Sequence, residues 1–383
     1  MRRGNLNLFH VLKVKQAINS PIKKFNLNLM YPPQIEAIRR ERDDFNKRKL
    51  KAGQWNKTFT EGLLRTKTAN EWMKQEFGKP AARPLFGSLW FENELCILFA
   101  DTNMGKSVLA VQIADCLTKC YSFEPFYNQA DEPLKVLYID FELSAKQFEA
   151  RYIKQAQLDT YLFSPNFYRS EFNPEADDGI AADNYGRQVQ EAISAAVTDT
   201  KAKVLIIDNI TYASNGTQNA NAALSLMKAL KALKIKFGLS ILVLAHTPKR
   251  NAYKPLTVND LQGSKMLINF ADSAFAIGQS YAAPGMRYIK QIKQRNQKEE
   301  YGENNICLIR QEKQINFLRY TFEGHAREAD HLRRPDTHEK EFLKQQVLQM
   351  HQKGHTLRQI AAELGVHFST VSRILKKSET ILS

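Results

Sequence analysis

The stretch "LCILFADTNMGKSVLAVQIAD", Leu95 to Asp115, decides the fold of this 383-residue chain. It begins with an apolar run typical of a buried strand, continues into a short loop ending in Gly105-Lys106-Ser107, and closes in an amphipathic helix. The loop has the spacing of a phosphate-binding loop, except that Ala100 stands where the first glycine is usual. That alanine costs about 1 kcal/mol only if its position requires a positive φ. The order of strand, loop and helix therefore predicts a phosphate site.

The residue types of this loop indicate a nucleoside triphosphate with Mg²⁺. Backbone N–H groups and the helix N-terminus would face the phosphates. Lys106 is expected to reach the β and γ phosphates of ATP, and Ser107 to hold Mg²⁺ through its hydroxyl. Asp208 ends the apolar run "KVLIID" and is the carboxylate expected to assist Mg²⁺ binding. The predicted nucleotide-binding residues are Ala100, Asp101, Thr102, Asn103, Met104, Gly105, Lys106, Ser107, Val108 and Asp208.

Hydrolysis also requires a carboxylate that orients or deprotonates the attacking water. The residue after Asp208 is Asn209, so this carboxylate must come from another segment. Glu142 follows the apolar run "VLYID", at the strand end where ligands bind in parallel sheets. A glutamate in the first turn of a helix is the alternative, because it interacts favourably with the helix dipole. From the residue pattern by itself, both interpretations stay open.

Short apolar runs alternate with helical stretches from about residue 85 to residue 325. The predicted strands are 95–100, 136–140, 204–210, 241–246 and 273–278, and the predicted helices are 106–120, 145–156, 186–197 and 222–237. Continuous apolar strands separated by helices favour an α/β fold whose mainly parallel sheet is covered on both faces. Three alternating stretches within 287–322 predict antiparallel strands at one edge of that sheet.

The net charge of +15 is concentrated at the two ends of the chain. Residues 1–51 hold 13 Lys and Arg against 4 Asp and Glu, and residues 287–383 hold 18 against 12, so the middle is neutral. Two basic ends on a neutral body favour a nucleic-acid partner. No apolar run approaches the roughly 18 residues that a membrane span needs. The N-terminus lacks the apolar pattern of a secretory signal, and the four cysteines are typical of buried thiols in a reducing compartment. We therefore expect a cytoplasmic protein without membrane contact.

These motifs, in this order, resemble the RecA-like superfamily of P-loop ATPases, particularly its DnaB-type and plasmid RepA-type hexameric helicases. The family carries its catalytic glutamate in a phrase of the form Glu-x-Ser-x-x-Gln-x-x-x-Arg, and this chain has Glu142, Ser144, Gln147 and Arg151 in that arrangement. The resemblance implies that Glu142 is the catalytic base. It also implies that His246, at the end of "ILVLAH", senses the γ-phosphate, although a strand-end histidine capped by backbone is the alternative.

The resemblance extends to two later segments. "NDLQGSK", Asp260 to Lys265 at its core, is similar to the family's Asp-Leu-Arg-Gly-Ser loop near a central pore, with Gln262 where arginine is usual. Gly263, Ser264 and Lys265 would then meet single-stranded DNA. "IKQIKQRNQ" is similar to the segment whose cations reach the neighbouring subunit's site, which implies that role for Lys293 and Arg295. A solvated basic turn would have a similar sequence.

The C-terminal stretch "GHTLRQIAAELGVHFSTVSRILKK" resembles the helix-turn-helix of resolvases and many regulators. Gly365 suits the turn, and the expected core residues are Ile360, Ala361, Leu364, Val366, Val371, Ile374 and Leu375. The residues expected to face the major groove or the phosphates of duplex DNA are Phe368, Ser369, Thr370, Ser372, Arg373 and Lys376. His367 is a weaker helix cap than the serine often found there. A helical hairpin used for subunit contact is the alternative.

The sequence therefore predicts a basic helical arm and linker at 1–80, a RecA-like ATPase domain at 81–328 and a helix-turn-helix domain at 339–383. The expected function is that of a DNA-dependent ATPase, acting as a hexamer or another ring or filament, of the helicase or the replication or mobilisation type. Two alternatives stay open: a DNA-binding regulator with a nucleotide-switch domain, and a filament-forming recombination or repair ATPase.

Overall fold

The computed structural model describes residues 40, 64–154, 159–173, 182–210, 220–248, 250–261, 265–334 and 337–382. The chain divides into two units, Met1–Pro80 and Ala81–Ser383. In the first unit, helix α3 (Ala69–Glu76) begins with a capping box, in which Thr68 and Glu71 satisfy each other's backbone N–H groups. Most of the predicted basic arm, Arg40 excepted, precedes the described residues.

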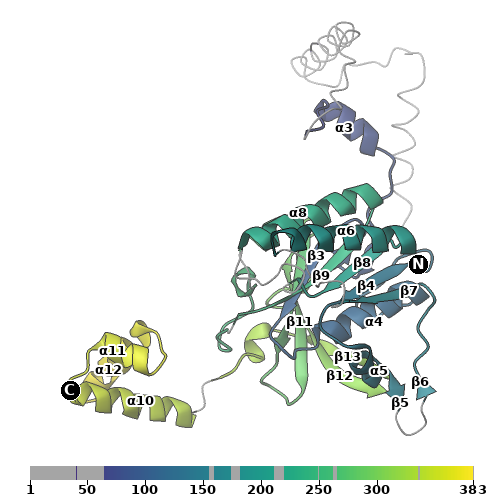
Figure 1. Ribbon diagram of the computed structural model, residues 1–383. Coiled ribbons are helices and arrows are strands. Elements are labelled where there is room, and N and C mark those ends of the chain that lie inside the picture. The colour runs from purple at the N-terminus through teal and green to yellow at the C-terminus, as the bar shows by residue number, and fades with distance from the viewer. Residues whose placement is uncertain are drawn as a thin grey trace, which may run out of the picture. The chain divides into compact units, whose positions relative to one another are not determined.

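A nine-stranded sheet organises the second unit, in the order β13-β12-β11-β10-β3-β9-β8-β4-β7 (Figure 1). Its parallel strands are β3 (Leu95–Ala100), β4 (Val136–Asp140), β7 (Phe167–Glu171), β8 (Val204–Asp208), β9 (Ser240–His246) and β10 (Ser273–Gln279). The antiparallel strands are β11 (Met286–Lys293), β12 (Ile306–Gln314) and β13 (Phe317–Ala326). The predicted α/β fold, with an antiparallel edge on a mainly parallel sheet, is therefore confirmed.

Among the described residues, the helices between the strands of the sheet are α4 (Lys106–Lys119), α5 (Ala145–Arg151), α6 (Ala182–Thr200), α8 (Ala220–Phe237) and α9 (Lys265–Phe270). Short elements complete this unit: β1 (Pro84–Phe86) pairs with β2 (Trp90–Phe91), β5 (Ile153–Lys154) pairs with β6 (Asp159–Thr160), and 3-10 turns span Val258–Asp260 and Glu328–Asp330. The predicted helix 145–156 ends early, at Arg151, because Tyr152 leaves it to pack against Phe163 and Phe317, with ring centroids 5.1 and 5.3 Å away.

Two apolar layers hold the sheet, one on each face. Successive residues of β3 point to opposite faces, so that Cys96 and Leu98 join the layer under α4, while Ile97 and Phe99 join the layer under α6 and α8. Helices α6 and α8 lie together on one face and α4 lies on the other (Figure 1). Because both faces are covered, the central strands are buried throughout, as their continuous apolar sequences predict.

Strand β13 also packs against α4. The Gln112 side chain exchanges two hydrogen bonds with the Tyr320 backbone: its Nε2 donates to the carbonyl at 3.0 Å, and its Oε1 accepts from the N–H at 2.8 Å. Helix α4 is consequently buried along most of its length, Lys106 included. The antiparallel edge is thus joined directly to the helix that follows the phosphate loop.

The C-terminal region is helical, with α10 (Thr337–Gln352), α11 (Leu357–Glu363) and α12 (Phe368–Leu382). Its core centres on Val347, Ile360, Ala361, Val371 and Leu375. All seven predicted core residues belong to this cluster: four are buried, and Leu364, Val366 and Ile374 are partly buried and pack against them. Within the described ranges, no helix combines the length and the apolarity that crossing a bilayer requires.

Candidate nucleotide site

The phosphate loop takes its shape from Asn103 and Gly105, which have φ values of 63° and 75°. Ala100 belongs to β3, where it pairs with Ile277 of β10 and His246 of β9 in extended structure. An extended backbone accepts any side chain, so the missing glycine costs nothing at that position. The strained positions are occupied by asparagine and glycine, the residues that best tolerate a positive φ.

Three acceptors surround the ammonium group of Lys106. Its Nζ lies 3.2 Å from the carbonyl oxygens of Ala100 and Asp101 and 3.1 Å from Nδ1 of His246. Burial lowers the pKa of Lys106, and the carboxylates of Asp208 and Glu142 oppose that shift. Because a lysine ammonium can only donate, this contact is a hydrogen bond when Nδ1 of His246 carries no proton.

Glu142 lies on the other side of the same imidazole. Its Oε1 is 3.2 Å from Nε2 of His246 and also accepts a short hydrogen bond from the amide of Asn209, which itself lies 2.9 Å from Nε2. The hydrogen bond from His246 lowers the pKa of Glu142. The structure therefore brings together Lys106, His246 and Glu142, which are far apart in the sequence. Asn209 also belongs to this group, although the sequence pattern predicted no role for it.

Asp208 is the most deeply buried acid of the site, with no exposed surface. One of its oxygens accepts from the Tyr138 hydroxyl at 2.5 Å. The other oxygen, Oδ1, is buried without a hydrogen-bond partner among the described residues. The nearby Ser107 side chain acts to lower the pKa of Asp208. Desolvation raises the pKa of Asp208 to about 6. An orphaned carboxylate oxygen beside a serine hydroxyl fits a Mg²⁺ ion or its bound water, so Ser107 and Asp208 suit the predicted metal site.

Side chains from the antiparallel edge support the loop from outside. The Tyr320 hydroxyl donates to the Met104 carbonyl at 2.7 Å, and Arg287 donates to the Asn103 carbonyl at 3.3 Å as well as to Tyr320. Gly105 is required by this contact in addition to its φ, because an added Cβ would lie 2.1 Å from the Tyr320 hydroxyl oxygen. No local sequence signal connects residues that are more than 180 positions apart.

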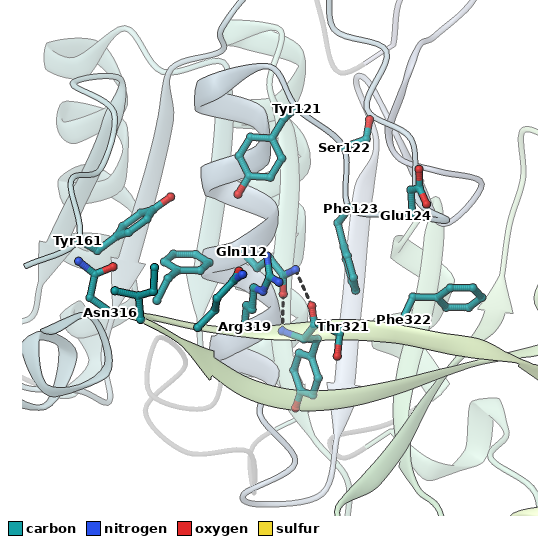
Figure 2. A pocket seen from close by; sticks show the side chains of 14 residues that line it. Gln112, Tyr121, Ser122, Phe123, Glu124, Tyr161, Asn316, Arg319, Thr321 and Phe322 are labelled. Carbon is teal, nitrogen blue, oxygen red and sulfur yellow. Dashed lines mark hydrogen bonds between the residues drawn. The ribbon is translucent and has the colours of Figure 1, made fainter. Parts of the chain in front are cut away.

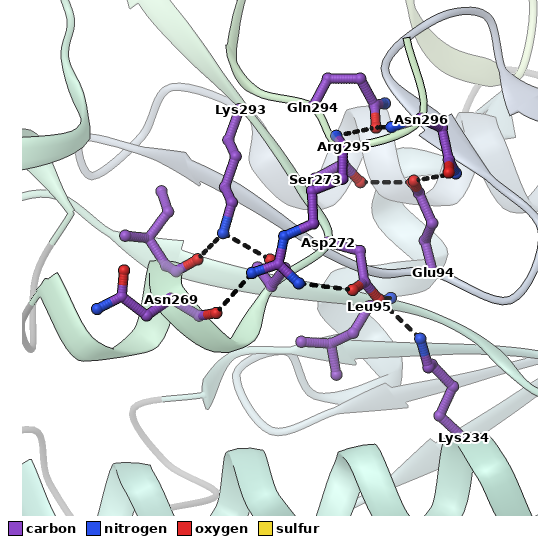
Figure 3. Close-up of polar contacts among 12 residues, drawn as sticks. Glu94, Leu95, Lys234, Asn269, Asp272, Ser273, Lys293, Gln294, Arg295 and Asn296 are labelled. Atoms are coloured by element: carbon purple, nitrogen blue, oxygen red, sulfur yellow. Dashed lines mark hydrogen bonds and ion pairs between the residues drawn. The ribbon is translucent and has the colours of Figure 1, made fainter. Parts of the chain in front are cut away.

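Lys293 and Arg295 lie away from this group, at the end of the sheet where the parallel strands begin. Lys293 pairs there with Ala274, near the start of β10. Figure 3 shows both side chains turned toward α9. Lys293 donates to the carbonyls of Ile268 and Ala271 at 2.5 and 2.7 Å, and Arg295 contacts Asp272 at 3.4 Å. Within one chain they therefore cap the C-terminus of α9. Half of the Arg295 side chain is exposed.

The loop expected to meet single-stranded DNA is described only at its ends. Gln262, Gly263 and Ser264 lie outside the described residues, Lys265 begins α9, and Asp260 caps a 3-10 turn with Thr257. The DNA role of this loop stays a prediction.

A separate cavity of about 650 Å³ lies between α4, the turn at residues 121–124 and β13 (Figure 2). Aromatic side chains such as Tyr121, Tyr161 and Phe322 line it, together with Arg319. Lys106, Glu142, Asp208 and His246 do not line it, so it is distinct from the candidate triphosphate site.

The six residues expected to contact DNA are all accessible in the C-terminal helices: Phe368, Ser369, Arg373 and Lys376 are exposed, and Thr370 and Ser372 are partly exposed. His367 caps α12 in spite of its weak propensity: its Nδ1 lies 3.2 Å from the Ser369 backbone N and 2.8 Å from the Ser369 hydroxyl. Thr356 and Gln359 form a capping box at the start of α11.

Two segments of the chain match known protein families. Residues 62–252 match the family model described as an AAA domain, and residues 338–380 match a homeodomain-like domain. No curated protein matches the chain. Among solved structures, it is similar to a KaiC-like protein of the hyperthermophilic archaeon Pyrococcus horikoshii, at 12% identity and a TM-score of 0.42, over 63% of this chain and 99% of that one. The family matches support a P-loop ATPase domain of AAA type followed by a helix-turn-helix DNA-binding domain.

Proposed function

We propose that this protein is a DNA-dependent ATPase that works as an oligomer, with a helicase or a replication or mobilisation role of the DnaB or RepA kind. The observation that supports hydrolysis is the chain of contacts from Lys106 through His246 to Glu142, with Asp208 beside it. A binding switch without turnover needs the lysine and Asp208, but it does not need an ionised glutamate held at the same strand edge.

Each group has a role that follows from its chemistry. Glu142, whose pKa is lowered, is ionised at neutral pH and would orient and deprotonate the attacking water. Lys106 would exchange its carbonyl partners for phosphate oxygens. Bound Mg²⁺ would neutralise charge on the phosphates and be held by Ser107 and Asp208. His246 contacts both Lys106 and Glu142, so it is suited to report the γ-phosphate to the base.

The oligomeric part of the proposal concerns Lys293 and Arg295. They lie at the end of the sheet opposite Lys106 of their own chain, which is consistent with action on a neighbouring subunit. In related chemistry, a cation supplied in trans raises turnover by about 10³-fold or more. The helix-turn-helix would hold duplex DNA, and the loop at 260–265 would contact a single strand.

The test is ATP turnover with and without single-stranded DNA, in wild type and in Glu142→Gln. Glu149→Gln is the matched control, because Glu149 lies on the neighbouring helix α5 and pairs with Lys146 at the surface. We expect DNA-stimulated turnover that falls by about 10²-fold or more in Glu142→Gln while ATP binding persists, and no change in the control.

Turnover that Glu142→Gln leaves intact would overturn the assignment of the base. Slow turnover that single-stranded DNA does not stimulate would favour the DNA-binding regulator instead. Strand displacement assays, set against imaging of filaments on DNA, separate a helicase from a recombination or repair ATPase.

A further inference from the structure

A second strand-end carboxylate, Asp140, lies beside the site. It ends β4, two residues before Glu142, and its Cα is the register partner of Asp208 in β8. It is 1% exposed. An acid at this edge of a parallel sheet is a natural candidate for a metal ligand, so its contacts decide what it does.

Both oxygens of Asp140 are already occupied. Oδ1 accepts from the backbone N–H groups of Glu142 and Leu143, at 3.1 and 2.8 Å. Oδ2 accepts from Nε and Nη2 of Arg169, at 3.2 and 3.0 Å. A carboxylate has about four acceptor positions, and four donors take them here. In this respect Asp140 is the opposite of Asp208, whose Oδ1 has no hydrogen-bond partner among the described residues.

Arg169 lies on the edge strand β7, and further contacts hold its side chain in place. Its Nη2 also donates to the Leu143 carbonyl at 2.5 Å, its Nη1 pairs with Glu171 at 3.0 Å, and its guanidinium lies 4.9 Å from the centroid of the Phe148 ring. The planar fork thus joins Asp140 to the far side of the turn that carries Glu142. Its side chain is 16% exposed, so water competes little with these bonds.

The other end of the turn is fixed by the helix that follows. The Ser144 hydroxyl accepts from the Gln147 N–H at 3.3 Å, and the Gln147 side chain accepts from the Ser144 N–H at 3.0 Å. Glu142 is therefore bracketed by this capping box on one side and by Asp140 on the other, and its backbone has little freedom between them.

We propose that Asp140 and Arg169 form a positioning pair that holds Glu142 in the orientation where it meets His246, and that Asp140 is not a metal ligand. The inference rests on the proposed function, in which Glu142 activates water. Precise placement of a base is worth much of its effect, and a displacement of about 1 Å costs about 10²-fold in rate.

The experiment uses Asp140→Asn and Arg169→Lys in the full-length protein, with Glu171→Gln as the matched control. Asparagine keeps the acceptor for the backbone N–H groups but presents an amide to Arg169, and lysine keeps the charge of Arg169 without its fork. Glu171 touches Arg169 only through Nη1, is 53% exposed and leaves the Asp140 contacts in place. The measurements are kcat, the ATP Kd, the Mg²⁺ concentration at half-saturation, and hydrogen exchange of the Glu142 and Leu143 amides.

We expect Asp140→Asn to lower kcat by about 10²-fold, with the ATP Kd and the Mg²⁺ half-saturation unchanged and faster exchange of both amides. Arg169→Lys should lower kcat less, and Glu171→Gln should behave as wild type. If Asp140→Asn does not fold, Arg169→Lys tests the pair with the carboxylate in place.

Wild-type kcat in Asp140→Asn would overturn the inference, and so would a loss that excess Mg²⁺ restores, because that loss would make Asp140 a metal ligand. These outcomes differ from failure of the proposed function. If Glu142→Gln retains turnover, the proposed function fails, and the amide exchange alone then decides whether Asp140 holds the turn. If Glu142→Gln loses turnover while Asp140→Asn changes neither kcat nor exchange, the positioning pair fails and the function stands.

Discussion

Replacing Asp208 by asparagine should stabilise the protein while removing part of its metal site. Asp208 is fully buried, and desolvation raises its pKa from 3.8 to about 6. The native state therefore binds more protons than the unfolded state between these two pH values, and stability falls as the pH rises through that window. A rise of about two in pKa corresponds to about 3 kcal/mol, so above pH 6 the ionised Asp208 costs about that much.

Asparagine removes this cost and keeps an acceptor for the Tyr138 hydroxyl, which lies 2.5 Å from the carboxylate. We expect Asp208→Asn, without added nucleotide, to be about 3 kcal/mol more stable than wild type at pH 7.5 and equal to it near pH 4. The difference should grow between those values and level off above pH 6, where wild-type Asp208 is ionised. The measurement is urea denaturation followed by tryptophan fluorescence at a series of pH values.

Glu142→Gln is the control, because the sign of its effect is opposite. The hydrogen bond from His246 lowers the pKa of Glu142, so its carboxylate contributes stability above its ordinary pKa of 4.5 and loses it as the pH falls. Replacing Glu142 by glutamine should lower stability at neutral pH and lower it less in acid.

The reasoning would be refuted if Asp208→Asn were less stable than wild type at pH 7.5, or if its gain in stability were the same at every pH. Its Mg²⁺-dependent nucleotide binding should weaken at the same time, which is a trade of function for stability.

Two further predictions follow from other contacts. Gly105→Ala places a Cβ 2.1 Å from the Tyr320 hydroxyl oxygen, at a φ of 75°, so we expect about 2–3 kcal/mol of destabilisation and loss of nucleotide binding. Tyr320→Phe in the same chain should restore part of the stability in urea denaturation, and no recovery would contradict the contact. Arg373→Ala should weaken duplex DNA binding and lower the salt slope of the binding constant by about 0.9, as loss of one phosphate contact does. An unchanged slope, equal to that of the control Lys353→Ala, would remove Arg373 from the DNA interface.

Local sequence patterns determined the elements and the type of site. The runs at 95–100 and 136–140 are strands with those bounds, because residues buried on both faces leave a continuous apolar signal. The phosphate loop was predicted from its spacing and its place between a strand and a helix, and the helix-turn-helix from the resemblance of residues 354–377 to that of resolvases and regulators. Strand β7, "FYRSE", was missed, because an edge strand with mixed polar residues has neither an apolar run nor a clear alternation.

Only the tertiary structure decided which side chains meet. Strand order places β9 between β3 and β8, which brings His246 between Lys106 and Glu142, and no local pattern contains that order. The same holds for Arg169, which reaches Asp140 because β7 pairs with β4, and for Tyr320, which reaches Met104 because β13 packs against α4. A short stretch of chain encodes its own periodicity and turns, whereas convergence depends on how all the strands and helices bury their apolar faces together.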